Sequence, residues 1–557
     1  MTASEIKHTD MTATPSTKPQ MNTVAQQLDA LRTLTPRQKY KQLLNATHPE
    51  QLVQAMPPQD LFLLIKELGA ADVPELVGLA SADQLTCFID MDGWRDEQLD
   101  TDQARQWLGL ILEQEESDQL RLIDEMDFDL LVLVLKKQLE IVRGLEALDD
   151  DELEQPRLRR DQLYECLYQD EQQAKALETL QELLFRERRE FYLMLMEAVR
   201  HELELALEEH VFQHRNGRLA DLGFDNSVQA RQLRSWLDPA TFNAQDFRKQ
   251  ARFFTAPQTS APGFVLTVAR PRDLLADVIG NSLTPELCQE LSFLLNRAMS
   301  ADGVDFGDPQ QVQQSLEDVY HLLNIALGFL AGQDIDQATQ LFEQVYLQAL
   351  YRLGFSLLLR LSRRARQIRQ SAIGPYLDGP DAALIDALDR DMPRCYAGVA
   401  EPLRGGDRPF QCRADVDAVD RELACIEALR QLFEGGGLFS LPQPDDLDLR
   451  GCQPALASEV TLSELFLTAV ANQVMGRPFA PAPLALNELP ELHRRLTDSP
   501  GAFAAWQEQS RQLCEQQAPG SAAFVDFCFN ILQQEFCALE PADLKPEFVG
   551  GFLLRLA

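Results

Sequence analysis

The sequence predicts a mainly all-α protein, in which an N-terminal helical-repeat solenoid is followed by long-helix and helical-bundle units. Two observations carry this prediction. Residues 49–93 repeat at a spacing of 24, and helical repeats of this kind stack into solenoids. Residues 157–216 contain neither glycine nor proline, a composition that favours long helices. The repeat aligns Leu52, Val53, Leu61, Leu64, Ile65 and Gly69 with Leu76, Val77, Leu85, Phe88, Ile89 and Gly93.

The first quarter of the chain is expected to form the solenoid. Residues 1–23 have no apolar run that would make a secretory signal, so we expect a disordered tail there. Thr35, Pro36 and Gln38 then stand in the order that a helix start requires. The repeat pattern returns with altered spacing from Ser117 to Asp127. Because each short helix has one face too apolar to stand alone, stacking of the repeats over residues 24–145 would bury it.

The remaining residues divide at changes of composition. An acidic linker is expected at 146–156 and long helices over 157–250, of which residues 157–216 would form one rod or a hairpin. A helical middle domain follows over 251–373, with Phe264–Val268 as an extended connection. Residues 374–460 read as a Gly/Pro-rich linker region with one helix near 416–434, and 461–557 as a C-terminal helical domain.

The composition of the chain indicates the cellular environment and the kinds of partner that we expect. The 557 residues include 51 basic and 87 acidic side chains, for a formal net charge of -36. Such a charge repels nucleic acid and anionic membranes and favours basic partners or cations. The longest apolar run, Leu130–Leu135, is far shorter than the ~18–20 residues of a membrane span. Ten cysteines without a Cys-x-x-Cys pair are typical of reduced thiols, so we expect a cytoplasmic protein.

One polar cluster follows the long helical stretch. His210 and His214 are one helical turn apart, and Arg215, Arg218 and Asp221 follow directly. Two histidines at this spacing can share a metal, with a nearby carboxylate as a further ligand. A favourable interaction of surface histidines with the carbonyl end of a helix explains the same residues. No third ligand is fixed by spacing, so the metal interpretation is the weaker one.

A second cluster is rich in arginine. Arg360, Arg363 and Arg364 are expected on one face of a helix, where guanidinium groups could bind an anion or phosphate. In so acidic a chain, pairing with the protein's own carboxylates is the favoured interpretation. In a third segment, Asp90, Asp92 and Asp96 lack the order of a calcium loop and are expected at a solvated helix end.

Signatures of catalysis are missing from the sequence. Gly435, Gly436 and Gly437 are not followed by Lys-Ser or Lys-Thr, so they do not form a phosphate-binding loop. The chain also lacks a Gly-x-Ser-x-Gly elbow. The sequence identifies no cofactor and assigns no reaction, which favours a protein other than an enzyme.

Several short motifs together resemble a bacterial family of unknown function, number 6178, over nearly the full length. The motifs are Pro58–Leu61 with Ile65–Glu67, Gly217–Gly223, Ala301–Gly303 with Leu323–Leu327, Arg408–Phe410, and Leu462–Leu465 with Ala471–Asn472. That resemblance implies no catalytic residues. Residues 24–145 more weakly resemble the cytosolic helical domain of MgtE-type magnesium transporters, without the membrane domain of those proteins.

Two hypotheses about function follow. The first is a cytoplasmic interaction or scaffold protein that binds a protein partner through the repeat, with self-association through the long helices as a further possibility. The alternative is an enzyme or a ligand- or metal-sensing protein with a polar site at His210–Asp221. The two differ in geometry, since a sensing site requires its side chains to converge on one pocket.

Overall fold

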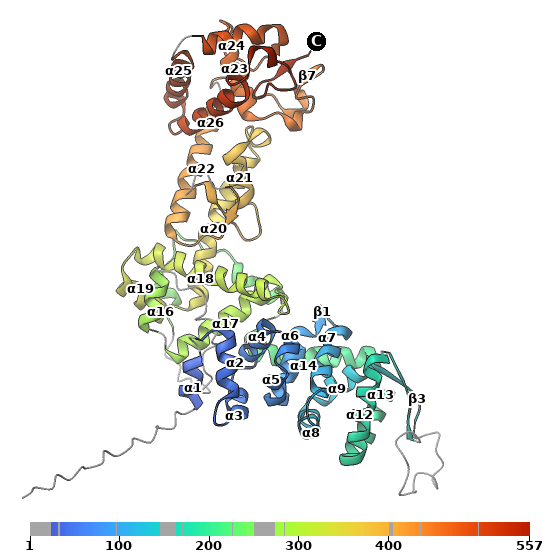
Figure 1. Cartoon of the computed structure of the whole chain (residues 1–557). Helices are drawn as coiled ribbons and strands as arrows, with labels where there is room; N and C mark the ends of the chain where they lie inside the picture. The colour runs from blue at the N-terminus through green and yellow to red at the C-terminus, as the bar shows by residue number, and fades with distance from the viewer. Residues whose placement is uncertain are drawn as a thin grey trace, which may run out of the picture. The chain divides into compact units, whose positions relative to one another are not determined.

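The computed structural model describes residues 24–31, 34–95, 97–144, 163–169, 171–225, 227–249, 273–282, 284–399, 405–433, 437–498 and 501–556. The chain divides into two compact units (Figure 1). Unit 1 comprises Met1–Ala230, Phe253–Arg270 and Leu283–Leu316, and unit 2 comprises Arg231–Arg252, Pro271–Ser282 and Glu317–Ala557. Helices dominate both, which confirms the predicted mainly all-α class. The predicted tail at 1–23, the acidic linker at 146–156 and the connection Phe264–Val268 lie outside the described residues.

Unit 1 is built from short helices followed by three longer ones. Its elements are α1 (Val24–Leu31), α2 (Pro36–Leu44), α3 (Pro49–Gln54), α4 (Pro58–Leu68), α5 (Pro74–Leu79), α6 (Ala82–Asp92), β1 (Trp94–Arg95), β2 (Gln98–Leu99), α7 (Thr101–Leu112), α8 (Glu116–Glu125), α9 (Phe128–Lys136), β3 (Leu139–Arg143), β4 (Glu165–Tyr168), α12 (Glu171–Glu187), α13 (Arg189–His201), α14 (Glu204–Asp221), α15 (Ser227–Ala230) and α17 (Pro285–Asp302). Helix α18 (Pro309–Ala331) begins in unit 1, and the division falls within it.

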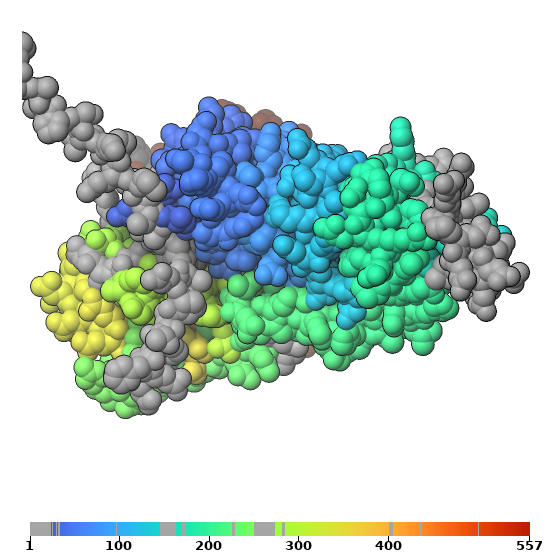
Figure 2. Space-filling view, turned by 90° about the horizontal axis from the view of Figure 1, so that it is seen from below, coloured from blue at the N-terminus to red at the C-terminus, as the bar shows by residue number. Residues whose placement is uncertain are grey.

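The 24-residue repeat is a structural repeat. Helix α6 begins and ends 24 residues after α4, and the matched apolar side chains of both copies are buried. The buried amide of Gln84 joins the copies, because it donates to the carbonyls of Val53 at 3.0 Å and Met56 at 2.9 Å. Ser81 caps α6 by accepting from the backbone N–H of Gln84. In Figure 2 the surfaces of the repeats follow one another from blue to cyan in sequence order.

The region after the repeat differs from the prediction. Residues 171–221 form neither one rod nor a hairpin but three helices, α12, α13 and α14, interrupted at Arg188 and at Glu202–Leu203. The sequence gives no sign of these breaks, since neither contains glycine or proline. Strands β3 and β4, which no prediction included, pair antiparallel across the predicted linker position. Residues on both sides of that position therefore belong to unit 1.

Unit 2 is built around long helices. Its elements are η3 (Arg231–Arg234), η4 (Ala244–Phe247), α16 (Leu274–Ser282), the later part of α18, α19 (Ile335–Gln344), α20 (Leu347–Arg369), α21 (Gly379–Leu388), β5 (Cys395–Tyr396), β6 (Asp407–Arg408), α22 (Arg413–Phe433), β7 (Cys452–Gln453), α23 (Leu462–Val474), β8 (Leu484–Ala485), α24 (Leu489–Thr497), α25 (Ala502–Gln517), α26 (Ala522–Leu532) and β9 (Leu554–Arg555).

Helix α20 is central to unit 2, since most of its side chains up to Leu361 are buried. Gly354 lets it approach α18 closely, because a Cβ at this position would lie 2.2 Å from the carbonyl oxygen of Leu322. In the described part of residues 374–460 there are two α-helices, α21 and α22, and not the single helix predicted. The Gly379-Pro380 pair that suggested a linker lies in the first turn of α21, where proline is well tolerated. The C-terminal part also contains a small three-stranded sheet of order β7-β9-β8.

Candidate functional site

Helix α14 carries the five residues predicted as a polar site, and it separates them. Arg215 and Arg218 point toward α6, where they contact Asp90. His210 and His214 lie on a more exposed face, and Asp221 is exposed at the end of the helix. The five side chains therefore do not converge on one pocket.

Arg218 forms a junction between three helices of unit 1. Its guanidinium donates two hydrogen bonds to the carboxylate of Asp90 on α6, at 2.7 and 3.0 Å, and one to Asp127 at the start of α9, at 2.8 Å. The Asp90 side chain is 0% exposed. Burial raises the pKa of Asp90, while the hydrogen bonds from Arg218 oppose that shift. Burial alone would lower the pKa of Arg218, but its bonds to Asp90 raise it overall.

Arg215, three residues before Arg218 on α14, contacts the same part of α6. Its Nε donates to the backbone carbonyl of Asp90 at 2.7 Å. Its guanidinium also lies 5.5 Å from the ring centre of Trp94 and 5.8 Å from that of Phe212, within the range of cation–π contacts. Burial lowers the pKa of Arg215 to about 10. Both arginines thus serve the packing of α14 on α6.

The two histidines form a surface pair. The ring centres of His210 and His214 are 4.3 Å apart, and Nε2 of His210 lies 3.2 Å from the carboxylate of Asp129. His210 is half exposed. In the part of the chain that the structure describes, no three His, Cys, Asp or Glu side chains are grouped so that they could hold a metal ion. The geometry therefore favours the surface interpretation of these histidines over the metal interpretation.

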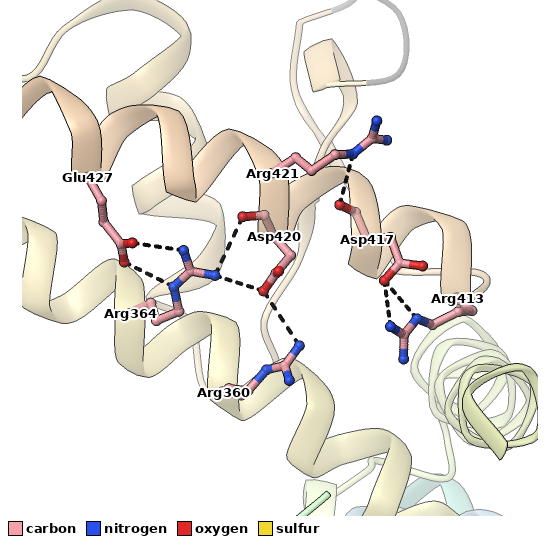
Figure 3. Close-up of polar contacts among 7 residues, drawn as sticks. All are labelled: Arg360, Arg364, Arg413, Asp417, Asp420, Arg421 and Glu427. Atoms are coloured by element: carbon pink, nitrogen blue, oxygen red, sulfur yellow. Dashed lines mark hydrogen bonds and ion pairs between the residues drawn. The ribbon is translucent and has the colours of Figure 1, made fainter. Parts of the chain in front are cut away.

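The predicted arginine cluster lies on α20 and faces α22 (Figure 3). Arg364 is bidentate to Glu427, with two bonds of 2.9 Å, and also donates to Asp420 at 2.7 Å. Arg360 reaches the same Asp420 carboxylate at 3.5 Å. The hydrogen bond to Glu427 raises the pKa of Arg364. These two arginines bind the protein's own carboxylates.

Arg363 points elsewhere. Its guanidinium lies 4.1 Å from the ring centre of Trp236, a stacking distance for a cation–π pair. Among the residues that the structure describes, it has no ion-pair partner. The three arginines that could bind an anion do not act on a common point, because Arg360 and Arg364 pair with carboxylates of α22, as the favoured interpretation expects.

Sequence reasoning missed two features of unit 1. Asp90 is a fully buried charged group, although its segment was interpreted as a solvated helix end. Its position after Leu85, Phe88 and Ile89 gave a signal for burial, but Arg218 lies 128 residues away and could not be assigned. The second feature is the joint between α13 and α14, where Leu203 and Leu205 are 76% and 81% exposed.

A family model matches nearly the full length of the chain. The model of a family described as a "family of unknown function (DUF6178)" matches residues 16–555, so the protein belongs to that family. No curated protein and no solved structure matches the chain. The weaker resemblance of 24–145 to MgtE-type transporters stays a prediction. Within the described ranges, no helix is both long enough and apolar enough to cross a membrane.

The motifs that suggested this family are packing joints in the fold. In unit 1 the amide of Asn296 donates to Gln59 at 3.3 Å and to the carbonyl of Leu222 at 2.6 Å, which brings two of the motifs together on α17. In unit 2 Asn324 donates to the carbonyl of Gln411 at 2.8 Å, just after another motif. Their role in this structure is to join helices.

Proposed function

We propose that the protein is an interaction or scaffold protein and that unit 1 binds a protein partner with a basic, amphipathic segment. The proposal rests chiefly on two exposed leucines where α14 begins, Leu203 at its N-cap and Leu205 in its first turn. Single exposed apolar side chains are ordinary on protein surfaces, but two leucines separated by one residue form a local apolar surface. We call Leu203 and Leu205 the leucine joint.

Ion pairs and a hydrogen bond of the neighbouring glutamates hold the leucine joint in place. Lys137, after α9, pairs with Glu204 at 2.5 Å and with the buried Glu208 at 3.3 Å. Glu208 also accepts from the backbone N–H of Leu99 at 3.0 Å. The joint is thus anchored to α9 and β2, while its leucines point into solvent. A preformed surface of this kind binds with a smaller ordering cost than a mobile one.

Neighbouring elements of unit 1 expose further large apolar side chains. They are Met194 on α13, Val142 on β3 and Leu167 on β4. Helix α13 packs on β3, and Tyr164 just before β4 donates to Glu197 of α13 at 2.7 Å. The apolar side chains therefore belong to connected elements of one unit.

The charge of the chain indicates the partner. Glu202 and Glu204 flank Leu203, and the formal net charge is -36. A second copy of the chain would carry the same charge and be repelled, whereas a basic partner would be attracted and its association accelerated. A helix with leucines on one face and lysines on the other complements both the apolar and the acidic components of the surface.

A designed peptide tests this proposal. The probe is a labelled 16-residue helix with leucine on one face and lysine on the other, and its control replaces each lysine with glutamate. Fluorescence anisotropy with the full-length protein should show binding of the basic peptide alone. Leu203→Ser/Leu205→Ser should weaken that binding by about tenfold or more, since each buried leucine contributes ~1.5–3 kcal/mol.

Leu456→Ser is the matched control, because Leu456 is an exposed leucine of unit 2. It should bind like the unchanged protein. Equal binding by the leucine-joint variant and the unchanged protein would contradict the location. Concentration-dependent dimerisation that the leucine-joint variant abolishes would identify a second copy as the occupant and refute the basic partner.

A further inference from the structure

We propose that unit 2 contains a binding site for a small hydroxycarboxylate in a cavity between η4 and α19. The cavity has a volume of about 170 Å³. At the ~30 Å³ that a water molecule occupies in the liquid, it has room for about six waters or one small organic ligand. Its polar lining consists of Gln245, Arg248, Gln337, Gln340 and Gln344.

The walls of this cavity are fixed by backbone hydrogen bonds. The N–H of Lys249 donates to the carbonyl of Gln344 at 2.7 Å, and the N–H of Tyr346 donates to that of Phe247 at 3.0 Å. Arg248 forms an antiparallel bridge with Val345. The segment after η4 is thus tied to the end of α19. The backbone around the cavity is therefore preorganised, which lowers the entropic cost of binding, while the polar side chains that line it are exposed at its open side.

The cavity is lined by a positive charge and by no negative charge among the described residues, although the protein is strongly acidic. In a chain with net charge -36, no carboxylate is among the described residues that line it. The guanidinium of Arg248 has no hydrogen-bond or ion-pair partner in the described ranges. Other arginines of unit 2, such as Arg364 and Arg408, are bidentate to carboxylates of the chain. Arg248 is exposed, and its planar fork is available to an external carboxylate.

The glutamines of the cavity indicate which groups the ligand carries besides its carboxylate. Gln337, Gln340 and Gln344 recur at helical spacing on the face of α19 that lines the cavity, and Gln245 lines it from η4. A carboxamide both donates and accepts, so it suits hydroxyl groups, which do the same. One positive charge and several carboxamides match a monoanion with hydroxyl groups better than a multiply charged phosphate.

Three small molecules separate these contributions. D-glycerate carries a carboxylate and two hydroxyls, propionate the carboxylate alone, and glycerol hydroxyls alone. Titration calorimetry and ligand-observed NMR with the full-length protein should show D-glycerate binding about tenfold or more tighter than either of the others, because each lacks one set of hydrogen bonds. Equal binding of all three, or no binding of D-glycerate, would overturn the proposal.

Two variants locate the site. Arg248→Gln should weaken D-glycerate binding by about ten- to a hundredfold, the loss expected for a charge-assisted pair. Gln340→Glu keeps Arg248 and places a carboxylate on the cavity wall, so it should also weaken binding at least about tenfold. Arg450→Gln removes one exposed positive charge far along the chain and should leave binding unchanged. Retention of binding in both cavity variants, or its equal loss in Arg450→Gln, would refute the site.

Discussion

Each unit contains an aspartate whose pKa is raised by burial, and the two units surround that aspartate differently. In unit 1, Asp90 of α6 receives two hydrogen bonds from Arg218, and Arg215 lies beside it. In unit 2, Asp381 in the first turn of α21 has Asp378 and Glu422 as its charged neighbours. Burial raises the pKa of both carboxyls. Arginines oppose the shift in unit 1, whereas acids add to it in unit 2 and raise the pKa of Asp381 to about 7.

This difference shows two ways of removing a carboxyl from water. An aspartate held by a bidentate arginine stays paired, so its unit depends on the arginine. An aspartate among other acids instead binds a proton near neutral pH, so its unit depends on pH. The comparison therefore predicts that unit 1 is sensitive to loss of a cation and that unit 2 is sensitive to alkalinity.

Arg218→Leu is the strongest test and should destabilise unit 1 by about 3–5 kcal/mol, because it leaves the Asp90 charge buried without a partner. Urea unfolding of the full-length protein gives the free energy, and hydrogen exchange in α6 and α14 assigns it to unit 1. Leucine at both Arg218 and Asp90 should recover much of the loss, since no charge is then stranded. Arg186→Leu, which removes an exposed pair with Glu116, is the control and should have no measurable effect. If Arg218→Leu and Arg186→Leu lowered the free energy of unfolding by similar amounts, burial of the Asp90 carboxylate would not be the cause of the effect.

Asp381→Asn should stabilise unit 2 at alkaline pH. The native carboxyl titrates at about 7 and its ordinary value is 3.8, so the folded protein binds the extra proton between these values. Stability contributed by this group therefore falls as pH rises from about 4 to 7 and stays low above 7. The full difference implies ~4 kcal/mol, but the side chain is only partly buried, and we expect about 2 kcal/mol at pH 8.

The pH dependence of that gain is its signature. Asp381→Asn and the unchanged protein should be equally stable near pH 4, where the native carboxyl is protonated and the unfolded one is partly so. Asp391→Asn, at an exposed position, is the matched control and should show no gain at pH 8. A gain for Asp381→Asn that is the same at pH 4 and pH 8 would show that the proton is not its cause.

The comparison also explains what the sequence could reveal. Local signals were reliable: Thr35 with Gln38 predicted the start of α2, and the 24-residue spacing predicted that α6 repeats α4. These features depend on residues close in sequence, where capping and helical period act directly. The breaks at Arg188 and Leu203 were not predictable, because they are imposed by packing on other helices and not by glycine or proline.

Polar partners at long separation were beyond sequence reasoning. The sequence predicts Arg215 and Arg218 as part of a polar site, but Asp90, which both contact, comes from a segment that is expected at a solvated helix end. The free Arg248 was overlooked because an isolated arginine has no motif. Its place beside the glutamines of α19 appears only when the segment after η4 and the end of α19 are brought together.

Arg364→Leu should have the smallest effect, about 1 kcal/mol, because this pair between α20 and α22 is only partly buried and its carboxylates remain hydrated when the arginine is lost. A double-mutant cycle with Glu427→Gln isolates the coupling. That coupling should shrink in 1 M NaCl, where the Debye length is ~3 Å, whereas the cost of Arg218→Leu should persist because Asp90 is not accessible to ions. An equal response of the two arginines to salt would mean that burial of the carboxylate does not set the difference between them. If the destabilisation by Arg218→Leu persists in 1 M NaCl while the coupling at Arg364 shrinks, the difference between the two arginines is due to the exclusion of water from Asp90.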